Sequence, residues 1–158
     1  MSKANQIQVG GTHYRSDYQH WDLAIMLDMG YLEGCSTAYV TRWRKKHGAE
    51  SRLTDLNKAL HYLDKLIEVY DIYDIHRPYD NDRVQQEVEK FALANQLTST
   101  ERDYIYFLCS YNNREDLKEA RETLLCIIVA EESRIATRIK CEPTGPGTPE
   151  DGGHYDQK

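Results

Sequence analysis

Two adjoining segments hold the residue types that could handle a charged ligand. Residues 36–46 read STAYVTRWRKK and residues 55–66 read DLNKALHYLDKL. The first segment gathers four cations around one tryptophan. The second, as a helix, would carry Asp55, Lys58 and Tyr62 on one polar stripe, because they recur at three- and four-residue steps. Three interpretations compete for the cationic segment: a nucleic-acid recognition helix, a site for a small phosphate ligand, or a solvated helix face.

Ordinary structural roles explain part of both segments. Cations in the last turn of a helix interact favourably with its macrodipole. Asp55 and Lys58 can form a weak i, i+3 ion pair on the helix surface. Tyr39 and Trp43 fall on the apolar side of the expected helix, where aromatic residues more often belong to the core than to a binding site.

The distribution of charge favours a small ligand over a nucleic acid. The chain of 158 residues has a formal net charge of −6. Residues 41–58 nevertheless hold six cations against two acidic residues, which leaves −10 on the remainder. Such a remainder would repel the long phosphate lattice of DNA, whereas a compact cationic pocket suits a mononucleotide. We therefore do not expect nucleic acid as a partner.

Several familiar site types are absent from the sequence. It has no G-x-x-x-x-G-K-[ST] phosphate loop, no nucleophile elbow, and no set of residues at the spacing of a metal site. Four cysteines without a C-x-x-C pair suit reduced thiols in a cytosolic protein. No apolar run approaches a membrane span, and the polar N-terminus does not resemble a signal peptide. We expect a cytoplasmic protein that does not contact a membrane.

The apolar periodicity is helical throughout and predicts an all-α protein. The turn-rich stretch 77–82 separates a small helical domain, residues 12–76, from residues 80–140, which form a helical extension or a second helical subdomain. The Pro- and Gly-rich residues 141–158 are expected to be a disordered tail. The expected helices cover about 21–29, 36–47, from Ser51 or Thr54 to 75, 82–96, 101–111 and 114–140.

The sequence also predicts details of these helices. Trp21 and Ile25 lie on the apolar stripe of the first helix, Ser36 is a candidate N-cap of the second, and Thr100 with Asp103 resembles a cap of the fifth. The third and sixth helices have broad apolar faces, from which we expect a homo-oligomer.

Three motifs in the first half of the chain resemble a known family. They are HY at 13–14, GCSTAYVTRWRKK at 34–46 and DLNKALHYLDKL at 55–66. Their order and spacing resemble a small domain of tailed phages, typified by the nucleotide kinase of T7-like phages. The family pattern runs HY, then GN-x-x-KY-x-x-R-x-x-x-K, then DL-x-KA-x-x-Y-L-x-x-L. The resemblance covers about residues 12–70.

The resemblance implies phosphoryl transfer from a nucleoside triphosphate to a deoxynucleoside monophosphate, without a phosphate loop. Such a reaction needs mainly positioning and charge neutralisation, for which Mg²⁺ is a possible companion of the triphosphate. An arginine can grip a phosphate through two hydrogen bonds, while a lysine acts as a point charge. The implied catalytic residues are His13, Arg42, Asp55 and Lys58, and the implied nucleotide-binding residues are Tyr14, Tyr39, Lys45, Lys46 and Tyr62.

Two departures from the family pattern motivate an alternative. Cys35 and Ala38 occupy the positions of the Asn and Lys in GN-x-x-KY, so a cation of the pattern is missing. The alternative is a non-catalytic protein of the same fold, which sequesters nucleotides or inhibits a protein of the bacterial host.

Overall fold

The computed structural model describes residues 16–73 and 80–141. Within these two ranges it contains six α-helices, one short 3-10 helix and no strand, which confirms the predicted all-α class. The elements are α2 (His20–Met26), α3 (Tyr31–Arg42), the 3-10 helix η1 (Trp43–Lys45), α4 (Ala49–Tyr73), α5 (Asn81–Asn95), α6 (Ser99–Ser110) and α7 (Arg114–Cys141).

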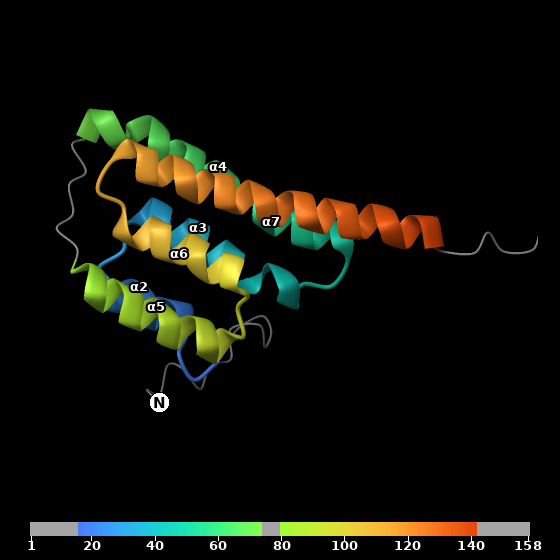
Figure 1. Ribbon diagram of the computed structural model, residues 1–158, viewed down its shortest axis with the longest axis horizontal. Helices are drawn as coiled ribbons and strands as arrows, with labels where there is room; N and C mark the ends of the chain where they lie inside the picture. Colours follow the sequence, from blue (N-terminus) through green and yellow to red (C-terminus); the bar gives the residue numbers. More distant parts are fainter. Residues whose placement is uncertain (1–15, 74–79, 142–158) are drawn as a thin grey trace, which may run out of the picture.

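The helices are stacked in pairs. The two longest helices, α4 and α7, lie side by side, with α3 and α6 beneath them and α2 and α5 on the far side of that layer (Figure 1). Each layer therefore combines one helix from the first half of the chain with one from the second. The two halves on either side of residues 74–79 pack directly against each other.

A single hydrophobic core runs through all three layers. Its fully buried members come from both halves of the chain, since Leu23 near the N-terminus and Leu124 in the last helix belong to the same cluster. The apolar face of α4 and that of α7 up to Ile128 are buried in this core and packed against each other, whereas Ile139 near the end of α7 is exposed. The buried parts of the two faces consequently give no support to the expected homo-oligomer. The core includes Leu23, Val40, Leu56, Leu63, Phe91, Tyr104, Ile105, Leu108, Leu117 and Leu124.

Ser36 has a different role from the predicted one. Helix α3 begins five residues earlier, at Tyr31, with Gly30 as its N-cap, so Ser36 lies inside the helix. Its hydroxyl donates to the carbonyl of Ala59, at 2.6 Å, and lies 2.5 Å from the hydroxyl of Tyr104. This buried serine joins α3 to α4 and α6 instead of capping a helix, because its polar group is satisfied across the core.

The apolar stripe predicted for the first helix is also wrong. Trp21 and Ile25 are 45% and 80% exposed, while Leu23 and Leu27 are buried in the core. Helix α2 has only seven residues and ends at Met26 instead of at about Met29. A helix this short carries little periodic information, so the pair of leucines at i and i+4 determines which side faces inward.

The cap of α6 lies two residues before the predicted one. Thr98, not Thr100, precedes the helix, and its hydroxyl accepts a hydrogen bond from the backbone N–H of Glu101, at 3.2 Å. The Glu101 carboxylate in turn accepts one from the backbone N–H of Thr98, at 2.7 Å. This reciprocal arrangement is a capping box, which satisfies two helix-end donors.

Across the described ranges, no helix combines the length and the apolar character needed to cross a bilayer. Among the described side chains Cys35, Cys109 and Cys126 are free thiols. The predicted tail, 141–158, lies outside the described residues except for Cys141 at the end of α7.

His20 is held as a neutral ring between helices. Its Nε2 lies 2.7 Å from the hydroxyl of Thr37 on α3, and its ring meets that of Phe91 on α5 edge-on, at 6.2 Å between centroids. Burial lowers the pKa of His20 to about 4. The folded protein therefore excludes a proton that the unfolded chain accepts near the ordinary histidine pKa.

The role of Thr98 as the N-cap of α6 can be tested directly by mutation. We expect Thr98→Ala to lower the free energy of unfolding by about 1 kcal/mol, because the α6 cap is lost. The matched substitution Thr100→Ala, within the first turn, should change it by less than about 0.5 kcal/mol. Urea denaturation followed by circular dichroism measures both. Equal losses in the two variants would contradict the cap assigned to Thr98.

His20 predicts a specific pH dependence of stability. Between the unfolded pKa and the folded pKa of about 4, the unfolded chain binds more protons, so stability falls as the pH falls through this window. From about pH 7.5 to about pH 5 we expect the wild type to lose about 2 kcal/mol more than His20→Gln. Urea denaturation of both proteins at each pH provides the comparison. Parallel losses would show that His20 does not titrate in this way.

Candidate functional site

Five of the residues proposed from the sequence gather on one surface. Helices α3 and α4 follow one another through η1 and pack together, which brings Tyr39 and Arg42 of α3 beside Asp55, Lys58 and Tyr62 of α4. We call these five residues the α3–α4 face. Their steps of three and four residues explain why each helix presents its contribution on one side.

Arg42 and Asp55 form the fixed part of this face. Nε of Arg42 donates to Oδ2 of Asp55 at 2.9 Å, and Nη2 donates to Oδ1 at 3.3 Å. Asp55 is buried and Arg42 is partly buried, so water competes little with this two-point contact. The sequence suggested an ion pair between Asp55 and Lys58, but the ion pair described in the structure joins Asp55 to Arg42. In this position the Asp55 carboxylate can orient the Arg42 guanidinium group.

Two cations lie close to the ring of Tyr39. The guanidinium carbon of Arg42 lies 4.5 Å from the centre of the Tyr39 ring, and Nζ of Lys58 lies 5.5 Å from it. Both are within the range of cation–π attraction. Arg42 and Lys58 therefore converge on one aromatic ring although they come from different helices.

A second tyrosine extends the aromatic surface. Tyr62 stacks on Tyr39 with ring centres 5.9 Å apart and planes 19° apart, and meets Tyr31 edge-on at 6.0 Å. The interaction of the Tyr62 hydroxyl with Tyr31 is the main reason that the pKa of Tyr62 is raised. The face thus offers flat rings for stacking next to two cations, which is the chemistry that a nucleotide requires.

Lys45 and Lys46 lie at the end of η1 rather than on this face. Burial, with a smaller effect of the neighbouring Arg44 charge, lowers the pKa of Lys45. The hydrogen bonds, ion pairs and ring contacts found in the described part of the chain join neither lysine to the α3–α4 face. His13 and Tyr14, the remaining predicted site residues, lie outside the described residues.

Trp43 belongs to a different set of contacts. Its indole Nε1 donates to Oε1 of Glu101, at 2.6 Å, and its side chain is buried. Nη2 of Arg44 lies 2.8 Å from Oε2 of the same carboxylate. Glu101 is 1% exposed, so these partners and the capping box compensate for the burial of its charge. The structural role expected for Trp43 is the one observed.

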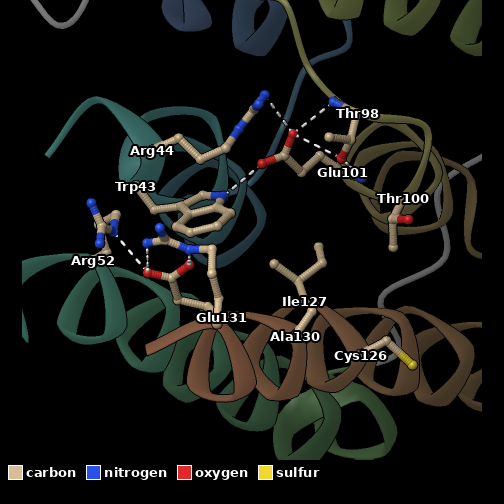
Figure 2. Close-up of a pocket in the computed structure, with 11 residues that line it drawn as sticks. Trp43, Arg44, Arg52, Thr98, Thr100, Glu101, Cys126, Ile127, Ala130 and Glu131 are labelled. Atoms are coloured by element: carbon tan, nitrogen blue, oxygen red, sulfur yellow. Dashed lines mark hydrogen bonds and ion pairs between the residues drawn. The ribbon is translucent and has the colours of Figure 1, made fainter. Parts of the chain in front are cut away.

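Trp43 and Arg44 border a cavity of about 530 Å³ that the sequence did not predict. Its other side is α7, where Glu131 accepts hydrogen bonds from Arg52 at 2.7 Å and from two nitrogens of Arg134 at 2.7 Å (Figure 2). The hydrogen bond from Arg134 is the main reason that the pKa of Glu131 is lowered. The T-x-x-E spacing of residues 98–101 is typical of a capping box, so the role of Glu101 at the start of α6 could have been predicted from the sequence. No local pattern relates Arg52 to Glu131, which are 79 residues apart.

Comparisons with models of protein families, with curated proteins and with solved structures find no match. The resemblance to the phage nucleotide-kinase domain therefore depends on the three motifs quoted above. Within the described ranges, no three His, Cys, Asp or Glu side chains form a group able to hold a metal ion.

Proposed function

We propose that the protein is a nucleotide-binding protein of the phage nucleotide-kinase type. It binds a deoxynucleoside monophosphate on the α3–α4 face and transfers to it a phosphoryl group from a nucleoside triphosphate. The observation that carries this proposal is the convergence of Arg42 and Lys58 on the ring of Tyr39. The triphosphate, with Mg²⁺ as its possible companion, comes from the family resemblance.

The contacts of the face suggest a division of roles. Arg42 meets the phosphate as a planar fork whose orientation is held by Asp55. Lys58, exposed on α4, supplies a mobile point charge. Tyr39 and Tyr62 stack with the base. Orientation before the ligand arrives favours phosphoryl transfer, because that reaction depends on positioning and charge stabilisation.

A second function is favoured by the surroundings of Cys35 and Ala38. Cys35 contacts Tyr62 at the edge of the α3–α4 face, and Ala38 precedes Arg42 by four residues on α3, hence on the same side. The missing lysine of the family pattern thus falls next to the candidate phosphate site. The alternative is a non-catalytic protein that sequesters nucleotides or inhibits a host factor.

Both proposed functions include self-association, but through other apolar side chains than those from which the sequence predicted it. Most of the apolar faces of α4 and α7 is buried within the chain, whereas Trp21, Ile25 and Tyr31 are exposed around α2 and the start of α3 and Ile139 is exposed near the end of α7. Exposed apolar side chains of this size are typical of interfaces.

The kinase proposal is tested with dTMP or dGMP and a nucleoside triphosphate, by measuring diphosphate product. We expect Lys58→Gln to lower kcat/KM by about 10- to 100-fold, because a charge-assisted contact to phosphate contributes about 1.5–3 kcal/mol. Lys65→Gln removes a lysine of the same helix that pairs with Glu68, and it should leave the rate within about twofold.

Two results would contradict the kinase proposal. If the wild type binds either monophosphate without forming product, the non-catalytic alternative replaces it. If Lys58→Gln and Lys65→Gln behave alike, the phosphate does not bind at the α3–α4 face.

Restoring the missing cation tests the position of the phosphate independently of turnover. We expect Ala38→Lys to tighten binding of dTMP by about tenfold, because it adds a positive charge one turn from Arg42. Ala136→Lys adds the same charge to an exposed position of α7 and serves as the control. Calorimetric titration measures both. Equal affinities would mean that residue 38 is not near the bound phosphate.

A further inference from the structure

The cavity between η1, the start of α6 and α7 is a second candidate binding site. Its volume of about 530 Å³ falls within the usual range for small-molecule sites. It is bordered by elements from both halves of the chain and includes neither Tyr39, Arg42 nor Lys58 among its lining residues. It is therefore separate from the α3–α4 face.

The interior of this cavity is largely apolar. Trp43 and Glu101 form one wall, and Ile127 and Ala130 of α7 form the facing wall, with open space between them (Figure 2). Trp43 and Ile127, which both line the cavity, are buried residues of the hydrophobic core. Such walls suit a flat or aliphatic body rather than a strongly hydrated one.

The two carboxylates of the cavity are already neutralised. Glu101 accepts hydrogen bonds from Trp43 and Thr98 and pairs with Arg44. Glu131 pairs with Arg52 and Arg134. Both carboxylates are buried, so a cationic ligand could reach them only by displacing an arginine with which they are already paired. A cationic ligand is consequently a poor fit, whereas an anion has to bind without drawing these arginines away from their carboxylates.

The arginines leave an excess of positive charge. Three arginines line the cavity against two carboxylates, in a chain whose net charge is −6. The side chains of Arg44 and Arg134 are 41% and 52% exposed, so their guanidinium groups lie at the mouth. A neighbouring cavity of about 290 Å³ is lined by Arg52 and Arg134 as well, and adds Arg138. The cationic end of the site therefore continues along α7.

We propose that this cavity binds a small organic anion, with its apolar ring or chain between Trp43 and Ala130 and its anionic group at Arg44 and Arg134. The limited volume and the small excess of charge favour one compact ligand over a polyanion. Phosphate, carboxylate and sulfonate groups share the planar or tetrahedral oxygens that an arginine fork recognises.

The test uses 8-anilinonaphthalene-1-sulfonate, an aromatic anion whose fluorescence rises on binding. We expect saturable binding to the folded wild type, weaker by at least about tenfold for the uncharged dye N-phenyl-1-naphthylamine. Ala130→Trp fills the cavity from an exposed helix position and should weaken sulfonate binding by at least about tenfold. The matched control Ala136→Trp lies on the same helix, and Lys58→Gln alters the α3–α4 face; both should retain wild-type affinity.

The proposal is overturned if Ala130→Trp binds the sulfonate as tightly as Ala136→Trp, or if the uncharged dye binds equally well. Loss of binding in Lys58→Gln alone would assign the dye to the α3–α4 face.

A second experiment uses only the wild-type protein, so its result does not depend on whether a variant folds. Cys126 lines the cavity and is exposed, so saturating dye should slow its alkylation by iodoacetamide several-fold. An unchanged alkylation rate would also overturn the proposal.

Discussion

The burial of the Glu101 carboxylate is the constraint on which much of this structure depends. A charge removed from water is tolerated only when its oxygens are compensated, and the three partners of Glu101 come from two places in the fold, η1 and the N-cap of α6. The Thr98 cap fixes the start of α6, Trp43 attaches η1 to it, and Arg44 closes the mouth of the cavity. One side chain thereby joins the two halves of the chain. It also directs Trp43 and Arg44 away from the α3–α4 face, where Arg42 remains.

The protein separates the three arginines of its basic segment by giving each a defined acidic partner. Arg42 is paired with Asp55, Arg44 with Glu101, and Arg52 with Glu131. In sequence these cations belong to one basic segment of an acidic chain, but in space they serve two different surfaces. A basic cluster read from sequence alone therefore overstates the charge that any one ligand would meet, because much of it is compensated within the fold.

The parts of this arrangement that follow local rules could be predicted from the sequence. The long helices α4 and α7 carry apolar residues at three- and four-residue steps over many turns, and the steps between Asp55, Lys58 and Tyr62 required those three residues to share a face. The seven-residue α2 was misjudged because two turns carry too little pattern. Ser36 was misjudged because its partners, Ala59 and Tyr104, are supplied by packing and not by neighbours in sequence. The pairing of Arg52 with Glu131 has the same origin.

The change from α3 to a 3-10 helix at Trp43 has a consequence for how the chain length can vary. Of three successive residues, Arg42 contacts Asp55 of α4, whereas Trp43 and Arg44 both contact Glu101 of α6, and the tighter winding of η1 sets the angle between these two directions. One inserted or deleted residue would rotate everything after it by about 100°. The number of residues between Arg42 and Lys46 is therefore fixed by geometry, in addition to the side chains of Trp43 and Arg44 that Glu101 needs as partners. At this connection an insertion or deletion is as damaging as the loss of one of these partners.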